Sequence, residues 1–434
     1  MQTASVIGRR RERGQTIVLV AISIVSLLAM AALAIDVVTL YVARTEIQRA
    51  ADAAALAGAK AIADSGVTTL PSTDSNCTAA VTLAHTMATA AINAVLPNNL
   101  VSGTAPALMA GSPSFTNLTG CPANDPEVTV SLQRTGLPTF FAHIWGTRAA
   151  TTGASATAEA YNPANSTGNF TPIAPRNVKP WLVANLDPYH APAGTFVTAG
   201  AVETGAIGET FYLTSACGPG ATCSPTFPLT ATNGPPREVQ YIPALVTANA
   251  SNVCPSCLGP KDFERSIECS DANAYAYLSC GGGAANAQWD STVIPAGAAH
   301  ETRDGVFCLT HETSEGGPGS NSGQDILTDP SPWPAGPKEI TAESGPQSGN
   351  KVSTSSSIVS IPLINPTVTG TTVTIMGYLQ AFINYVSDGS DGSNADDVNI
   401  TVLNVVGCGT TNNGATPILG GTGTSPIPVR LITP

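Results

Sequence analysis

The chain has 434 residues, enough for two or three domains, and only 11% of them are charged. Its formal net charge is −12, so its surface repels nucleic acid and anionic lipid headgroups, and we expect no nucleic-acid partner. The composition includes 41 glycines and 34 prolines. Much of the polarity comes from threonine, serine and asparagine, which is typical of an extracellular or periplasmic β-rich protein rather than a cytosolic enzyme.

The N-terminal region reads as a membrane anchor. Four arginines lie within residues 9–13, and no ionisable group occurs from Thr16 to Ile35, where eleven residues are isoleucine, valine or leucine. About twenty helical residues span the roughly 30 Å hydrocarbon core of a bilayer. The stretch therefore predicts a retained transmembrane helix. A cleaved secretory signal is the alternative, with Ala32 and Ala34 imitating a small-residue cleavage site.

The flanking charges predict the orientation of this helix. Arginines close to a membrane span stay on the cytoplasmic side, which places residues 1–14 inside and Asp36 onward outside. We therefore expect a single-pass protein in a lipid bilayer with a large extracytoplasmic body. Without its N-terminal 14 residues the chain keeps 14 basic and 29 acidic residues, so that body is strongly acidic.

The cysteine content suits an oxidising compartment, because all ten cysteines lie outside the apolar stretch. Five disulfides are possible, and sequence alone does not give their connectivity. Two pairings are favoured: Cys217 with Cys223, which would close a local loop, and Cys77 with Cys121, which would join the second expected helix to the strand region. The full set of disulfide candidates is Cys77, Cys121, Cys217, Cys223, Cys254, Cys257, Cys269, Cys280, Cys308 and Cys408.

The membrane helix is expected to continue to about Ala63, because residues 15–57 contain no glycine or proline. Beyond the span its faces differ. Arg44, Gln48 and Asp52 form a polar row at i, i+4 spacing. The opposite row consists of small residues, which allow another helix to approach closely. Either the chain's own domain or another subunit packs there, and the residues proposed for partner packing are Ile47, Ala50, Ala54, Gly58 and Ala61.

The region from 64 to 163 predicts a small α+β domain. A second helix is expected from Thr78 to Leu96, and alternating residues predict a strand at Val128–Leu132. Pro138 suits the first turn of a short helix that carries Phe140, Phe141, Ile144 and Trp145, and an Ala/Thr-rich strand follows at Thr147–Tyr161.

Residues 164–434 predict a β-rich, disulfide-braced domain, either a sandwich or an irregular β fold. Residues 313–350 are dense in glycine, serine and proline and predict a flexible loop. The strand candidates are Trp181–Leu186, Glu209–Leu213, Val239–Val246, Val306–Thr310, Ser357–Ile364, Thr372–Asn384 and Val398–Val406.

The N-terminal segment resembles the corresponding module of TadE/TadG-like proteins of Flp (Tad) pilus assembly. The shared pieces are a basic residue before Gly14-Gln15, the apolar span, Ala34-Ile35-Asp36 at its exit, and Tyr41 followed by Arg44, Gln48 and the string AADAAALAGA. This resemblance covers residues 11–63, and a looser similarity extends to residue 161. It implies a bacterial inner-membrane, pilin-like or pilus-associated protein that is not an enzyme.

Two departures limit what the resemblance implies. Pseudopilins of this system are cleaved after a glycine that is followed five residues later by glutamate. Here Leu19 stands at that spacing from Gly14, so cleavage is not expected. Longer members carry a von Willebrand factor A domain with an Asp-x-Ser-x-Ser metal signature. The string from Asp388 to Gly392 breaks that signature at its last position, so that domain is not predicted.

Three other patterns in the sequence resemble parts of chemical sites. Cys254-x-x-Cys257 with Cys269 and Cys280 could hold zinc, but disulfides are the default in an oxidising compartment. Neither His300-Glu301 nor His311-Glu312 forms the H-E-x-x-H pattern of a zinc protease. A solvated turn is the favoured interpretation of the acidic string near residue 390, with calcium as the alternative, and its weak calcium candidates are Asp388, Asp391 and Asp396.

The sequence therefore predicts a non-enzymatic, membrane-anchored component of Flp/Tad pilus assembly or secretion. It would act by anchoring and by packing against proteins of that machinery, with a homo- or hetero-oligomer possible through the N-terminal helix. We expect no cofactor and no catalytic residue. The alternative is a cell-surface adhesin or matrix-binding protein for which the helix is only a tether.

Overall fold

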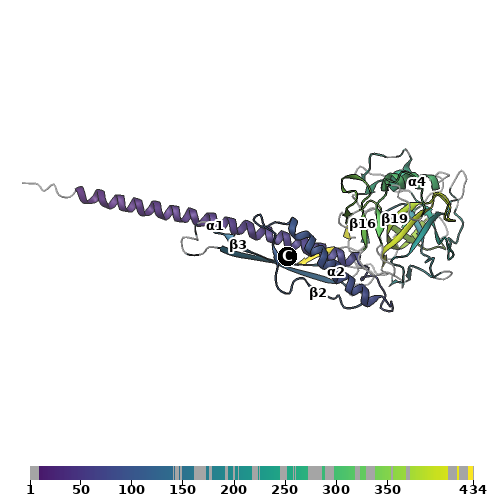
Figure 1. Cartoon of the computed structure of the whole chain (residues 1–434), viewed down its shortest axis with the longest axis horizontal. Coiled ribbons are helices and arrows are strands. Elements are labelled where there is room, and N and C mark those ends of the chain that lie inside the picture. Colours follow the sequence, from purple (N-terminus) through teal and green to yellow (C-terminus); the bar gives the residue numbers. More distant parts are fainter. Residues whose placement is uncertain are drawn as a thin grey trace, which may run out of the picture.

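A single helix of 56 residues, α1 (Arg9–Asp64), runs from one end of the molecule to the edge of the β domain. The computed structural model describes residues 9–139, 141, 146, 149–160, 173–174, 178–190, 194–198, 201–203, 205–217, 223, 225–244, 252–257, 259, 261–271, 286–288, 298–317, 323–328, 338–352, 355–367, 372–408, 418–419 and 429–433. In Figure 1 the first half of α1 projects alone, its second half packs into a small domain, and a rounded β domain lies at the far end. The predicted membrane-anchored α+β class is confirmed.

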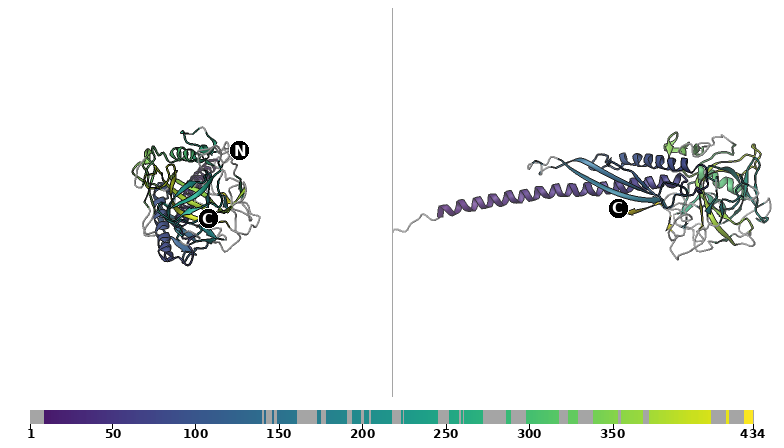
Figure 2. Two further views of the ribbon diagram at one scale, coloured as in Figure 1. Left: turned by 90° about the vertical axis from the view of Figure 1, so that its right-hand side faces the viewer. Right: turned by 90° about the horizontal axis from the view of Figure 1, so that it is seen from below.

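The small domain, called the module from here on, packs α1 and α2 (Cys77–Val95) against one antiparallel sheet. The sheet has the order β1-β3-β4-β22, and β2 also pairs with β3. The two long strands, β3 and β4, form most of the sheet. Both extend along α1 closer to its N-terminal end than α2 does (Figure 2). The strands are β1 (Ala107–Leu108), β2 (Ser114–Thr116), β3 (Glu127–Pro138), β4 (Ala149–Ala160) and β22 (Val429–Thr433).

Alternation of side chains explains how the sheet covers α1. Val128, Val130 and Leu132 are fully buried on the helix side of β3. On the other face the hydroxyl groups of Thr129 and Thr157 lie 2.9 Å apart. The strand extends beyond its predicted end, so Pro138 closes β3 and does not begin a helix. Of the expected Phe-Phe helix, Phe140, Ile144 and Trp145 lie outside the described residues.

The C-terminal strand returns to the module. Residues Val429–Leu431 of β22 pair antiparallel with Ala160–Ala158 of β4, and Figure 1 shows this yellow strand beside α1 and the other strands of the module. The ion pair between Arg430 and Glu159 joins the same two strands. The predicted division at residue 163 therefore needs one change. The β domain is inserted between two neighbouring strands of the module sheet.

The β domain is built on a closed ring of six strands. β11 pairs with β6, and the ring continues through β18, β19, β20 and β9, which pairs back to β11. The pairs β6–β18 and β9–β11 are parallel and the other four are antiparallel. These strands are β6 (Trp181–Ala184), β9 (Thr210–Ser215), β11 (Glu238–Pro243), β18 (Ile358–Ile364), β19 (Thr372–Val386) and β20 (Val398–Gly407).

Six of the seven predicted strands correspond to this ring. The seventh, Val306–Thr310, is wrong, because these residues end helix α4 (Ala298–Thr310), which packs on α3 (Asp262–Glu268). A five-residue apolar run does not distinguish a strand from one face of a helix. The predicted loop at 313–350 contains two strands of a three-stranded sheet, β15 (Ile326–Thr328) and β16 (Glu339–Thr341), with β17 (Lys351–Val352) as the third.

The remaining elements are short. Ring strands β11 and β19 also pair with β10 and β14, while β12 pairs with β13, β7 with β8, and β21 with β5. Their bounds are β5 (Ile173–Ala174), β7 (Val197–Thr198), β8 (Ala201–Val202), β10 (Ala231–Thr232), β12 (Asn252–Val253), β13 (Ser270–Asp271), β14 (Asn286–Gln288), β21 (Ile418–Leu419), η1 (Leu96–Asn98) and η3 (Gly345–Gln347).

Buried polar contacts join the module to the β domain. Asn404 of β20 is fully buried, and its Nδ2 donates to the carbonyl oxygen of Ala63 at 2.6 Å, near the end of α1. Its Oδ1 accepts a hydrogen bond from the Thr69 hydroxyl at 3.0 Å. Ile207 of the β domain is buried in the core of the module. The C-terminal end of α1 is therefore held by the inserted domain.

Disulfides brace both domains, as predicted. Cys77–Cys121 and Cys217–Cys223 form, and both of these pairings were predicted. Cys254–Cys269 and Cys257–Cys308 form the other pairs described here, and Cys408 is also disulfide-bonded. Cys280 lies outside the described residues.

The two predicted bridges should differ in their contribution to stability. Cys77–Cys121 closes a sequence separation of 44 residues, and Cys217–Cys223 closes one of 6. Loop-closure entropy then gives about 4 kcal/mol for the first bridge and about 2 kcal/mol for the second. We expect the Cys77→Ser/Cys121→Ser variant to unfold at lower denaturant concentration than the Cys217→Ser/Cys223→Ser variant. Chemical denaturation followed by circular dichroism measures both, and equal losses would contradict the expectation.

Candidate membrane anchor and helix seam

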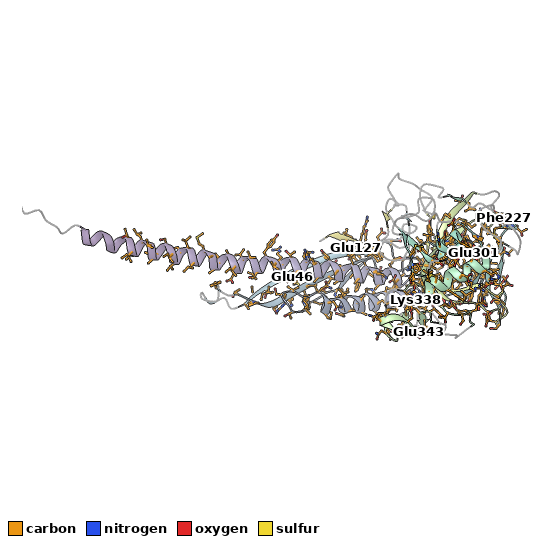
Figure 3. All side chains as sticks on the ribbon, turned by 90° about the horizontal axis from the view of Figure 1, so that it is seen from above. Glu46, Glu127, Phe227, Glu301, Lys338 and Glu343 are labelled. Atoms are coloured by element: carbon orange, nitrogen blue, oxygen red, sulfur yellow. A yellow bond between two sulfur atoms is a disulfide. The ribbon has the colours of Figure 1, made fainter. Side chains whose placement is uncertain are left out.

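The N-terminal half of α1 presents large apolar side chains on nearly all sides. Exposed isoleucine, leucine, valine, methionine and tyrosine residues run from Ile17, which is 70% exposed, to Val42, which is 48% exposed. Figure 3 shows these side chains projecting from the bare part of the helix, whereas strands flank it around Glu46. A helix that is apolar all round and unburied by its own chain fits a membrane span. Arg44 is the first exposed charged residue after this stretch.

One narrow side of α1 is nevertheless covered by the chain. Ala32, Asp36, Ala43, Ile47 and Ala50 are buried, and they recur at spacings of three or four residues or a multiple of these. We call this side the helix seam, and it continues through Ala54, Ala55, Gly58, Ala59 and Ile62. Its small side chains let β3, β4 and α2 approach the helix backbone.

The predicted partner-packing residues all belong to this covered part of α1. Ile47 and Ala54 are fully buried, Ala50 is 1% exposed, and Ala61 is 8% exposed. A Cβ added to Gly58 would lie 2.9 Å from Ile92 Cδ1 of α2 and 3.3 Å from Val128 Cγ1 of β3. The chain's own module therefore occupies this row, and the row is not accessible to a partner in this structure.

Asp36 links the end of the apolar stretch to the β3–β4 hairpin. It is the one acidic residue between Gln15 and Arg44, and it is only 3% exposed. Its Oδ2 accepts a hydrogen bond from the backbone N–H of Phe141 at 3.0 Å. Phe141 lies in the connection between β3 and β4, so the tip of the hairpin reaches α1 one turn from Ala32. The carboxylate is shielded from the surroundings of the exposed apolar side chains.

After Val42, polar side chains of α1 form hydrogen bonds within the module. Gln48 Nε2 donates to Asp52 Oδ1 at 2.9 Å, as the i, i+4 polar row predicted, and to the Ser155 carbonyl of β4 at 3.4 Å. Glu46 Oε2 accepts from the backbone N–H of Ser102 at 2.7 Å. The surface of α1 therefore changes from apolar to polar between Val42 and Glu46.

Two helices in the described part of the chain are long and apolar enough to cross a membrane, Thr16–Asp64 and Cys77–Asn98. The second, which comprises α2 and η1, packs its buried residues Ala84, Ala88 and Ile92 in the module core. Its first residue, Cys77, is covalently joined to Cys121. α2 is therefore built into the module, and α1 is the candidate anchor.

Among the described residues, the cysteine and aspartate patterns noted in the sequence form no metal site. Cys254 and Cys257 bond to different cysteines, so no four-thiolate zinc site forms among the described residues. Asp388 Oδ1 accepts from Ser390 N at 2.8 Å, and Asp391 accepts from the Ser393 hydroxyl at 2.6 Å.

The third calcium candidate lies in an ion-pair network instead. Asp396 pairs with His300 at 2.9 Å and with Arg303 at 3.2 Å. The three carboxylates are thus directed to different partners and do not converge on one point. Within the described residues they form no group that could hold a metal ion.

A different cluster, which the sequence did not suggest, lies in the β domain close to the module. His190 Nδ1 is 2.7 Å from Asp187 Oδ2 and 4.0 Å from Glu209 Oε1. Burial, and next the neighbouring Asp187 carboxylate, raise the pKa of Glu209 to about 9. Asp187 and His190 are close in sequence, but Glu209 comes from the start of another strand. No spacing motif in the sequence predicts this cluster.

These features define a class of protein: a single apolar helix continuous with a small α+β module into which a disulfide-braced β domain is inserted. Residues 14–61 match the model of the Flp pilus-assembly TadE/G-like family, and this segment lies entirely within α1. This match bears out the predicted resemblance and supports involvement in Flp/Tad pilus assembly. The matched segment begins at Gly14 and ends within α1, and it includes both the apolar stretch and most of the seam. No curated protein and no solved structure matches the chain significantly.

Filling the seam should destabilise the module itself. Gly58→Leu forces a side chain against Ile92 and Val128, and overpacking of this kind costs about 1–3 kcal/mol, only partly offset by the better helix propensity of leucine. We expect a lower unfolding temperature by differential scanning calorimetry. Ala57→Leu, one residue away on a half-exposed side, serves as the matched control. Equal unfolding temperatures for the two variants would show that the seam is not tightly packed.

Removing the Asp36 acceptor should release the hairpin tip. A hydrogen bond to a charged group contributes about 1.5–3 kcal/mol, so Asp36→Leu should speed hydrogen exchange at the Phe141 amide about tenfold or more. Hydrogen–deuterium exchange of the full chain in nanodiscs measures this change. Thr39→Val, at an exposed position one turn along, should leave the exchange rate unchanged. An unchanged rate in Asp36→Leu would mean that this bond does not hold the tip.

Proposed function

We propose that the chain is a non-enzymatic component of Flp/Tad pilus assembly or secretion that is anchored in the bacterial inner membrane by α1. The observation that carries the proposal is the division of the family-matched segment. Residues up to Val42 expose apolar side chains, and the residues after it build the core of the module. Because one continuous helix forms both parts, the module would be held at a fixed distance from the membrane, without a flexible linker.

The length of the exposed apolar surface supports a complete crossing. From Ile17 to Val42 it extends about 39 Å at 1.5 Å per residue. A bilayer measures about 30 Å across its hydrocarbon core and about 40–45 Å with its headgroup layers. In the proposed position the arginines of residues 9–13 lie in the cytoplasm, and Tyr41 lies in the outer headgroup layer, where aromatic residues concentrate.

The same position places the hairpin tip at the membrane surface. Asp36 lies within the exposed apolar length of α1, about 9 Å before Val42 along the helix, and it binds the backbone of Phe141. The sequence of this connection also includes Trp145, and tryptophan is enriched at membrane interfaces. The tip would therefore rest in the outer headgroup layer, and the module and β domain would extend away from it into the periplasm or beyond.

Protein partners are expected to meet α1 within or at the membrane. The seam is filled by the chain itself, whereas Val38 is 60% exposed and Tyr41 is 72% exposed on one side of the helix. Val38, Tyr41 and Val42 share a face because they are spaced three and four residues apart. We propose that an apolar helix of another pilus or secretion component packs on this face.

The partner face can be tested without disturbing the seam. The double variant Val38→Ser/Tyr41→Ser removes van der Waals packing between the two helices, so the affinity for the partner should fall about tenfold or more. Co-purification of Tad components with the full chain in mild detergent measures the loss. Thr45→Ser, at the next exposed position of this face, is the control. Unchanged recovery of the partners by the double variant would remove this face from the proposal.

The sheet topology offers a direct test of the anchoring role against the adhesin alternative. Ala160 of β4 pairs with Val429 of β22, so an Asn-Gly turn can replace residues 161–428 and close a tight hairpin. We expect this variant, without the β domain, to insert into the membrane and still recover Tad components. Loss of adhesion with intact pilus assembly would instead support the tether function. Loss of partner recovery by a variant that still inserts would contradict a role of the module in assembly.

A further inference from the structure

The cluster of Asp187, His190 and Glu209 has the chemistry of a metal site. One ligand atom from each of the three residues lies within 4.8 Å of the other two. In the described part of the chain, this is the one group of three or more histidine, cysteine, aspartate or glutamate residues that could hold a metal ion. Ligand atoms around a tetrahedral zinc ion with bonds of about 2.0–2.1 Å lie about 3.4 Å apart. Small rotations of the His190 and Glu209 side chains would bring the three atoms to that spacing.

One buried oxygen of the cluster, on Glu209, lacks a hydrogen-bond partner, although Glu209 also shares a side-chain hydrogen bond with Asp187. Glu209 is 8% exposed, and its Oε2 atom is buried without a hydrogen-bond partner. Asp187 is 1% exposed, and its Oδ1 already accepts from the Tyr189 backbone at 2.8 Å. An unpaired buried carboxylate oxygen is costly, and a bound cation is one way to satisfy it. The positive charge of Arg237 acts on Glu209 as well, but its guanidinium stacks 4.0 Å from the centre of the Tyr189 ring.

The surroundings hold the three groups in place and leave room for further ligands. Gly205 has a φ of +90°, which favours glycine, and a Cβ there would lie 3.3 Å from His190 Cε1 and crowd the imidazole. Glu209 also lines a cavity of about 380 Å³ between the two domains. Leu70, Asp74 and Asn76 line the same cavity from the module, and Tyr189, Ile207 and Gly208 line it from the β domain. Water molecules or a module side chain can complete the coordination from there.

We propose that Asp187, His190 and Glu209 bind a zinc-type divalent cation at the joint between the β domain and the module. One imidazole nitrogen with two carboxylate oxygens is a donor set that zinc accepts, whereas calcium and magnesium prefer oxygen ligands alone. The ion would fix the Asp187–His190 turn to the start of β9, beside the cavity that both domains line. It would stabilise the joint rather than catalyse a reaction. The proposal stands independently of the pilus-assembly role.

Zinc binding by the full chain in nanodiscs tests the proposal. The protein is stripped with a chelator and dialysed against micromolar ZnCl₂, and bound metal is counted by inductively coupled plasma mass spectrometry. We expect one zinc per chain, little or none in Glu209→Gln or His190→Asn, and no retained calcium or magnesium. The matched control is His300→Asn, which removes another histidine paired with an aspartate, at 2.9 Å. It should keep its zinc.

Thermal unfolding gives an independent readout. Zinc should raise the unfolding temperature of the wild-type chain and of His300→Asn, because a ligand that binds only the folded state stabilises it. It should not raise that of Glu209→Gln. His190 is 54% exposed, so His190→Asn is expected to fold even if Glu209→Gln does not. Absence of zinc from the wild-type chain, or full zinc occupancy in His190→Asn, would overturn the proposal.

Discussion

The close approach of a sheet and a second helix to the small-residue side of α1 is the contact on which the whole architecture depends. Alanine and glycine along the seam allow β3, β4 and α2 to pack directly against the helix backbone. The opposite side of the same helix, toward its N-terminus, carries the large aliphatic residues that favour lipid. One uninterrupted helix thus serves two environments. The two parts of the helix overlap at Asp36. There the β3–β4 connection covers the carboxylate, although large apolar side chains are exposed on both sides of it along the helix.

The inserted β domain depends on the same contact. Because β4 and β22 are neighbours in the module sheet, the chain leaves and re-enters the module at adjacent positions. The inserted domain therefore does not interrupt the packing on α1. Asn404 and Ile207 then fix the β domain to the membrane-distal end of the module. The segment that matches the TadE/G-like family lies wholly within α1, outside the inserted domain.

Sequence reasoning succeeded where one local pattern determines the outcome. The helix through Ala63 follows from the absence of glycine and proline before Gly58, and the alternation at Val128–Leu132 predicts β3. The small-residue row was identified, but its occupant was not, because alanine side chains indicate only close approach. The run at Val306–Thr310 was misassigned because its apolar residues fit a strand as well as one face of α4. Cysteine pairings that depend on distant contacts, such as Cys257–Cys308, were likewise beyond local patterns. So was the cluster of Asp187, His190 and Glu209, which the fold assembles from two elements.

The most direct test of this account is the depth of α1 in the membrane. Single cysteines at Ser26, Leu33 and Thr45 can be probed with a membrane-impermeant maleimide applied to intact spheroplasts, before and after detergent. The account predicts that Thr45→Cys reacts in intact membranes, whereas Ser26→Cys and Leu33→Cys react only once detergent has removed the bilayer. Labelling of Leu33→Cys in intact membranes, or protection of Thr45→Cys there, would contradict a helix that passes from lipid into its own module between Val42 and Glu46.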